Sequence, residues 1–162
     1  MNQDVESSLW GEVAEHWLAR TLATYPLRAG CRGGEPRDRF LDPAGYRFRE
    51  AFPVLVDELL GELNIERVRA ALEQVIRIRA VQDFTPSEAV GFVFFLKDVL
   101  RHDLPGVLTH RIEQRIDEMA LIAFDLLERC RWKMDEIRAG EARRSTYLPD
   151  RIRAGRAGRE AP

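Results

Sequence analysis

Apolar side chains recur every three or four residues along most of the chain, and this spacing predicts α-helices. No segment shows the strict alternation of apolar and polar residues that is typical of a half-buried strand. The expected helices lie at about 4–23, 43–60, 65–83, 86–103 and 108–137. The sequence therefore predicts an all-α fold of about five helices, in a compact bundle or a globin-like arrangement, with a long C-terminal helix.

Capping residues mark several of these boundaries. Asp42 precedes a first-turn proline, and Asn64 precedes the third helix, so both are expected N-caps. The sequence TPSE is a stronger signal, because Thr85 can cap the fourth helix while Glu88 reaches back to the cap in a capping box. Pro105-Gly106 is expected to follow the end of that helix.

Two stretches lack the helical pattern. The first, YPLRAGCRGGEPRDRFLD, is rich in Gly, Pro and Arg, and a loop of this length is typically mobile or functional. The second, 141–162, is rich in Arg, Gly and Ala and is predicted to be disordered or weakly helical. The expected organisation is one helical domain at 1–140 and a flexible tail at 141–162.

The last expected helix would be roughly 45 Å long, which exceeds what a small bundle needs to cover. Its core-facing positions form a heptad-like seam of Ile112, Ile116, Met119, Ala123, Leu126 and Cys130. Apolar residues continue to its far end, between basic ones, at Trp132, Met134 and Ile137. These three residues are a candidate interface with a partner. The alternative is that Trp132 folds back onto the first helix as part of the core.

A polar cluster precedes the fourth helix. On a helical wheel Arg79 falls inside the apolar stripe of the third helix, as does Asp83, whereas Arg77 points to solvent. A buried guanidinium needs an acceptor, which Asp83 or carbonyls at an adjoining helix end could supply. One interpretation is a structural pair that fixes the corner between two helices. The other is a half-buried anion or ligand site formed by Arg79, Gln82 and Asp83.

Composition and charge narrow the function classes. The chain of 162 residues is 45% hydrophobic and 32% charged, with a formal net charge of −2, so no nucleic-acid partner is expected. The longest apolar run, 89–96, is far shorter than the roughly 20 residues needed to span a bilayer. Neither a signal peptide nor a disulfide framework is evident. These features predict a cytoplasmic protein, while docking on a membrane complex stays open.

Residues that could hold a metal or haem are few. His102 and His110 flank the Pro105-Gly106 turn and His16 lies on the first helix, but they lack the spacing of a metal site. Cys130 is expected in the core, and Cys31 lies between arginines that could lower the pKa of its thiol and allow redox sensing. No catalytic motif occurs. We predict no catalytic, cofactor-binding or metal-binding residues, and no enzymatic activity.

The segment RIRAVQDF, followed by Thr-Pro-Ser and an Ala-Val-x-Phe helix that ends in Leu-Lys, resembles the N-terminal domain family of the RsbT co-antagonist proteins RsbR and RsbD. DRFLDPAGYRF resembles the family's entry to the second helix, and the resemblance covers about 5–137. It implies an all-helical sensory or regulatory domain without a known enzymatic activity. In longer members an output module follows, so this chain would be a stand-alone version that acts through partners.

The predicted function is thus non-enzymatic regulation through an unidentified protein partner, with a homodimer through the last helix as a further hypothesis. The resemblance also suggests an accessory role in a redox or sulfur-respiration complex. The alternative is a globin-like sensor that holds haem or another small molecule between its helices.

Overall fold

The computed structural model describes the backbone of residues 3–25 and 43–157, and the side chains of residues 7–25 and 44–144. In chain order the helices are α1 (Gln3–Leu22), α2 (Pro43–Leu60), α3 (Ile65–Ala80), α4 (Pro86–Asp103) and α5 (His110–Ala157). No strand occurs in these ranges, so the predicted all-α class with a long C-terminal helix is confirmed.

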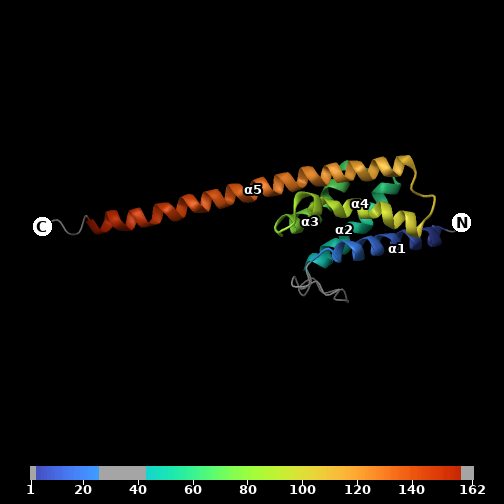
Figure 1. The fold of residues 1–162 in the computed structure, drawn as a ribbon, viewed down its shortest axis with the longest axis horizontal. Coiled ribbons are helices and arrows are strands. Elements are labelled where there is room, and N and C mark those ends of the chain that lie inside the picture. Colours follow the sequence, from blue (N-terminus) through green and yellow to red (C-terminus); the bar gives the residue numbers. More distant parts are fainter. Residues whose placement is uncertain (1–2, 26–42, 158–162) are drawn as a thin grey trace.

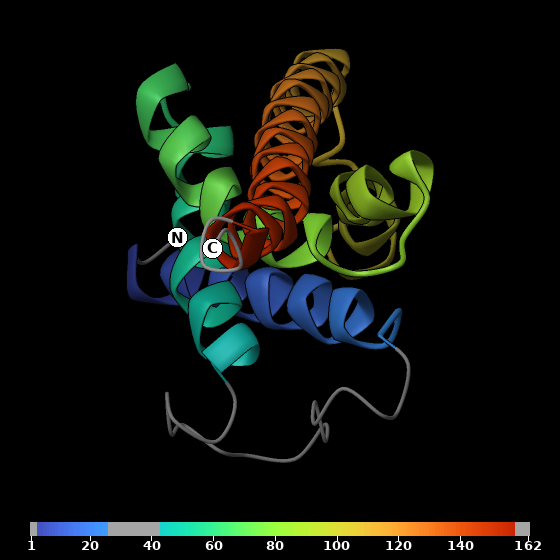
Figure 2. The same cartoon turned by 90° about the vertical axis from the view of Figure 1, so that its left-hand side faces the viewer.

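The five helices of the described residues surround one core, and each helix packs mainly against two others, so that together they form a ring. α1 contacts α2 and α4, α2 contacts α3, and α5 lies against α3 and α4. The view along α5 shows it between α3 and α4, with α1 crossing below them (Figure 2). Beyond this body α5 continues alone, so that its C-terminal part projects from the bundle (Figure 1).

Aromatic side chains form the centre of the core. Trp17 is fully buried and packs against Phe52 and Phe92, with ring centroids 4.2 Å and 6.1 Å away. Its indole nitrogen donates a 2.7 Å hydrogen bond to the backbone oxygen of Phe92, which satisfies the one polar atom that the ring buries. This bond also fixes α1 against α4, two helices that are far apart in the sequence.

The predicted N-caps Asn64 and Thr85 are confirmed, and the predicted cap Asp42 lies outside the described residues. Asn64 Oδ1 accepts hydrogen bonds from the backbone nitrogens of the second and third residues after it. Thr85 and Glu88 form the reciprocal capping box. The predicted end of the third helix is wrong, because α3 stops at Ala80 and a turn follows.

The predicted end of the last helix near residue 137 is also wrong. α5 has 48 residues, which corresponds to a length of about 72 Å. The residues that follow Ile137 are mostly strong helix formers such as Ala, Arg and Glu, with no proline before Pro149, so the helix has no local reason to stop. α5 therefore runs through most of the segment that the sequence assigned to a tail.

Candidate functional site

Arg79 is the most deeply buried charged side chain among the described residues, with 1% of its surface exposed. Its Nε donates to the backbone oxygen of Ala89 at 2.9 Å and its Nη2 to that of Glu88 at 2.8 Å. Its Nη1 donates to Thr24 Oγ1 at 3.2 Å, just after the end of α1. Arg79 therefore joins the ends of α1 and α3 to the first turn of α4.

Three aromatic rings surround the same guanidinium. Its central carbon lies 4.3 Å from the ring centroid of Phe84, 5.1 Å from that of Tyr25 and 5.3 Å from that of Phe92. Burial lowers the pKa of Arg79, although an arginine side chain stays protonated in proteins. Cation–π contacts and charge-assisted hydrogen bonds together replace the lost hydration. The arrangement is that of a structural joint between helices.

The other two members of the predicted polar cluster lie elsewhere. Because α3 ends at Ala80, the helical wheel does not apply to Gln82 and Asp83, and Asp83 is exposed. Both line a surface hollow of about 410 Å³ between the α3–α4 turn and α5 that Arg79 does not reach. The predicted pairing of Arg79 with Asp83 is therefore replaced by the second predicted acceptor, the carbonyls of an adjoining helix end.

The side of α5 that faces away from α3 carries large exposed apolar side chains. Leu121 is 69% exposed, Phe124 46% and Trp132 67%. At about 100° per residue these three positions fall within roughly 80° of one another, and we call them the outer face of α5. The alternative in which Trp132 packs on α1 is excluded, because α1 and α5 make no contact among the described residues.

Met134 and Ile137 point the opposite way from Trp132. Both line a groove of about 530 Å³ between α3 and α5, here called the α3–α5 groove. Met134 is partly buried against the core, whereas Ile137 is 55% exposed where α5 leaves the body. The three predicted interface residues thus belong to two different surfaces.

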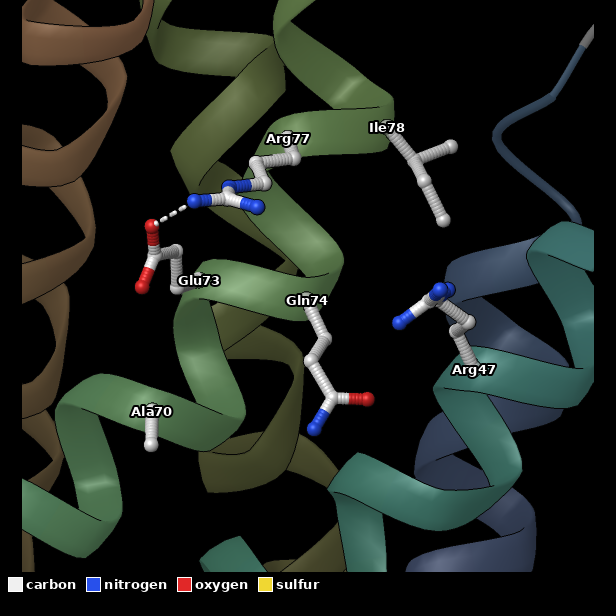
Figure 3. A pocket seen from close by; sticks show the side chains of 6 residues that line it. All are labelled: Arg47, Ala70, Glu73, Gln74, Arg77 and Ile78. Carbon is white, nitrogen blue, oxygen red and sulfur yellow. Dashed lines mark hydrogen bonds and ion pairs between the residues drawn. The ribbon is translucent and has the colours of Figure 1, made fainter.

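A smaller hollow of about 250 Å³ lies on the other side of α3, between α2 and α3. Figure 3 shows Ile78 of α3 pointing toward Arg47 of α2 across it. The ion pair of Glu73 with Arg77 lies at the edge that this hollow shares with the α3–α5 groove. Arg77 is solvent-exposed, as the helical wheel predicted.

The histidines lie at the surface. Asp103 accepts hydrogen bonds from His16 at 2.6 Å and from His102 at 2.7 Å, so this carboxylate bridges α1 and α4. The hydrogen bond that His16 donates to Asp103 raises the pKa of His16, while the bonds from His102 and His16 lower the pKa of Asp103. The sequence suggested that His102 lies near His110 and gave no sign of the contact with His16, because no local pattern indicates that α1 meets the end of α4.

The described residues contain neither a cluster that could bind a metal ion nor a cysteine with a lowered pKa. No group of three or more His, Cys, Asp and Glu side chains there could hold a metal ion. Cys130 is partly buried beside the core, and burial raises the pKa of its thiol, which disfavours the reactive thiolate. Cys31, the candidate redox cysteine, lies outside the described residues.

Comparison with known protein families confirms the resemblance seen in the sequence. The family model of the RsbT co-antagonist protein rsbRD N-terminal domain matches residues 11–144. The chain belongs to this family. RsbRD N-terminal domains are regulatory signalling domains that act through protein–protein interactions and are not known as catalytic. Searches of the curated proteins and of the solved structures found no match.

Among the exposed large apolar side chains of this RsbRD N-terminal domain, Leu121, Phe124, Trp132 and Ile137 belong to α5. No helix within the described ranges is long and apolar enough to cross a bilayer. Trp132 was a predicted interface residue, whereas Leu121 and Phe124, which lie three residues apart and off the heptad seam, were not predicted. Their position outside the heptad seam could have indicated a second apolar stripe on α5.

Proposed function

We propose that this RsbRD N-terminal domain is a non-enzymatic regulator that signals by binding another protein through the outer face of α5. The observation that carries the proposal is the exposure of Leu121, Phe124 and Trp132 on one side of a single helix. Large apolar side chains gathered on a surface are typical of an interaction site. Aromatic residues are also enriched among those that dominate binding energy.

The geometry of α5 supports a regulatory role. The helix is anchored to the core on one side by Ile116, Met119 and Ala123, all fully buried, and then projects from the body (Figure 1). The core-facing side and the outer face belong to one helix. A shift of α5 against the core would therefore also move the outer face and change how a partner binds there. An RsbT-type protein is the partner class that the family suggests.

Two narrower hypotheses accompany the proposal. A homodimer would form if the outer face bound a second copy of the chain. An accessory role in a redox or sulfur-respiration complex would place another protein on the same face. Both use the same surface, so one experiment addresses them together.

The experiment places a photo-crosslinking amino acid at Leu121 in one variant and at Glu12, an exposed residue of α1, in another. We expect a discrete crosslinked species from position 121 in cells of the source organism, and none from position 12. Trp132→Ala should remove that species, whereas Leu60→Ala, a change of another exposed apolar side chain, should not. Mass spectrometry of the species distinguishes a second copy from a different protein.

The proposal is contradicted if position 121 gives no discrete species, or if position 12 gives the same one. Circular dichroism of the Trp132→Ala variant should match that of the unmodified chain, because this side chain is two-thirds exposed. Loss of helicity would show that Trp132 supports the fold and that the interface lies elsewhere.

A further inference from the structure

The α3–α5 groove combines an apolar floor with a charged rim. The floor is formed by six side chains: Ala80, Val81, Leu126, Cys130, Met134 and Ile137. The rim carries four basic residues and one acid: Arg69, Arg77 and Glu73 from α3, and Arg129 and Lys133 from α5. An apolar strip bounded on both sides by cations is therefore exposed to solvent.

Most of the positive charge on the rim is not neutralised. Arg77 pairs with Glu73. Arg69, Arg129 and Lys133 form no ion pair within residues 7–25 and 44–144. One terminal nitrogen of Arg69 is also shielded from solvent without a hydrogen-bond partner. Three cations around one groove, in a chain whose net charge is −2, create a local positive potential that favours an acidic ligand.

The groove has the geometry of a helix-binding surface. Cys130, Met134 and Ile137 follow one another at intervals of four and three residues, so they align along one side of α5 over about 10 Å. A helix laid in such a groove contacts it with apolar residues at positions i, i+3 or i+4, and i+7. Acidic residues that flank this stripe would then meet Arg69 on one rim and Arg129 or Lys133 on the other.

From this charge complementarity we propose that the α3–α5 groove binds an acidic amphipathic helical segment of a partner protein. The site is separate from the outer face of α5, because Met134 and Ile137 point away from Trp132 on the helix. It goes beyond the function proposed above, since it assigns a second surface and specifies the chemistry of its ligand. A partner that docks here also contacts α3, so binding would hold α3 and α5 together where α5 leaves the body.

The test is a selection from a displayed library of random peptides on the full chain, and the affinity of the selected peptides is then measured on the Arg129→Glu/Lys133→Glu variant. Both side chains are exposed, so the variant should fold, which circular dichroism checks. We expect the selected peptides to be enriched in Asp and Glu that flank apolar residues at helical spacing. Fluorescence anisotropy of one labelled peptide should show affinity reduced about tenfold or more by the double charge reversal.

A charge-swap experiment and a control variant complete the design. The same peptide with its acids replaced by lysine should bind the charge-reversed variant better than the unmodified chain. Trp132→Ala should leave peptide affinity unchanged, which separates this site from the outer face. The proposal is overturned if selected peptides lack acidic residues, bind the charge-reversed variant equally well, or depend on Trp132.

An amphipathic small anion could satisfy the same chemistry. Laurate, below its micellar concentration, serves as the probe for this outcome. If laurate displaces the peptide and binds more tightly than any selected peptide, the groove is a fatty-acid site and the proposal of a helical protein ligand is wrong.

Discussion

The Nε atom of Arg79 lies 2.9 Å from the backbone oxygen of Ala89 and donates a hydrogen bond to it within the core. This bond connects the last turn of α3 to the first turn of α4. Two residues earlier on the same helix, Arg77 carries an identical side chain that is exposed and paired with Glu73. Two arginines that are neighbours in the sequence thus have opposite structural roles.

The first prediction compares these two arginines. Arg79→Ala should lower the free energy of unfolding by about 2–4 kcal/mol, because it removes three buried hydrogen bonds and leaves a cavity among the aromatic rings around the guanidinium. Arg77→Ala should lower it by under about 0.5 kcal/mol, as exposed substitutions usually do. Arg79→Lys is the matched control: it keeps the charge but loses the planar fork, so an intermediate loss is expected. Urea denaturation measures all three, and equal losses at the two alanine sites would contradict the assignment.

The second prediction concerns the hydrogen bond of His16 with Asp103. The pKa of His16 is raised in the folded state, so its stabilising contribution is complete below about pH 6.5 and is lost as pH rises through the raised pKa. The pKa of Asp103 is lowered, so its contribution is present above about pH 4 and is lost as pH falls further. The difference in unfolding free energy between the unmodified chain and His16→Gln should therefore be largest between these limits.

Measurement of urea midpoints from pH 4 to pH 9 tests this window. The effect should be modest, because the imidazole is 60% exposed and solvent screens the pair. A difference that grows above pH 7 would have the wrong sign and would contradict the prediction. His110→Gln is the control, since His110 is exposed at the start of α5 and makes no hydrogen bond with Asp103.

The third prediction addresses the haem alternative. We expect the purified protein to be colourless and to gain no Soret band when haemin is added, because His16, His102 and His110 are all exposed. An axial ligand must reach an iron held inside an apolar pocket. Absorbance titration with haemin measures this directly. A stable band that His102→Ala or His110→Ala abolishes would support the sensor interpretation instead.

The fourth prediction separates the fold from the C-terminal part of α5. Removal of the residues after Gly140 should change the free energy of unfolding by under about 0.5 kcal/mol, because residues 141–144 are exposed and α5 has already left the body there (Figure 1). Thermal denaturation of the shortened chain measures the effect. A loss of several degrees in the midpoint would mean that the projecting helix stabilises the domain.

The fifth prediction distinguishes the two surfaces that the sequence grouped together. Trp132→Ala should weaken binding at the outer face, and Ile137→Ala should weaken binding in the α3–α5 groove. Each change should leave the other interaction and the circular dichroism spectrum unchanged, because both side chains are more than half exposed. If the double variant instead unfolds, both residues belong to the core and neither surface is an interface.

The sequence by itself determined the elements of this fold. The capping box at Thr85 and the cap at Asn64 act within one turn of helix, so nearby residues are sufficient to predict them. The burial of Arg79 and the exposure of Arg77 followed from helical phase, which depends only on spacing within α3. The seam of α5 was predictable for the same reason, and Ile116, Met119 and Ala123 are buried as expected.

Only the tertiary structure decided which surfaces these elements create. The contact of His16 with Asp103 joins residues 87 positions apart, and Arg79 takes its acceptors from another helix because α3 ends before Asp83. Helical phase alone separates Trp132 from Met134 and Ile137, but the packing of α3 on the side of Met134 and Ile137 is what makes that side a groove. Local propensity and phase define which side of a helix is apolar, but the neighbour that covers it is selected by packing between helices distant in the sequence. On the outer face of α5 no other helix of the described residues packs, so the apolar stripe there stays exposed.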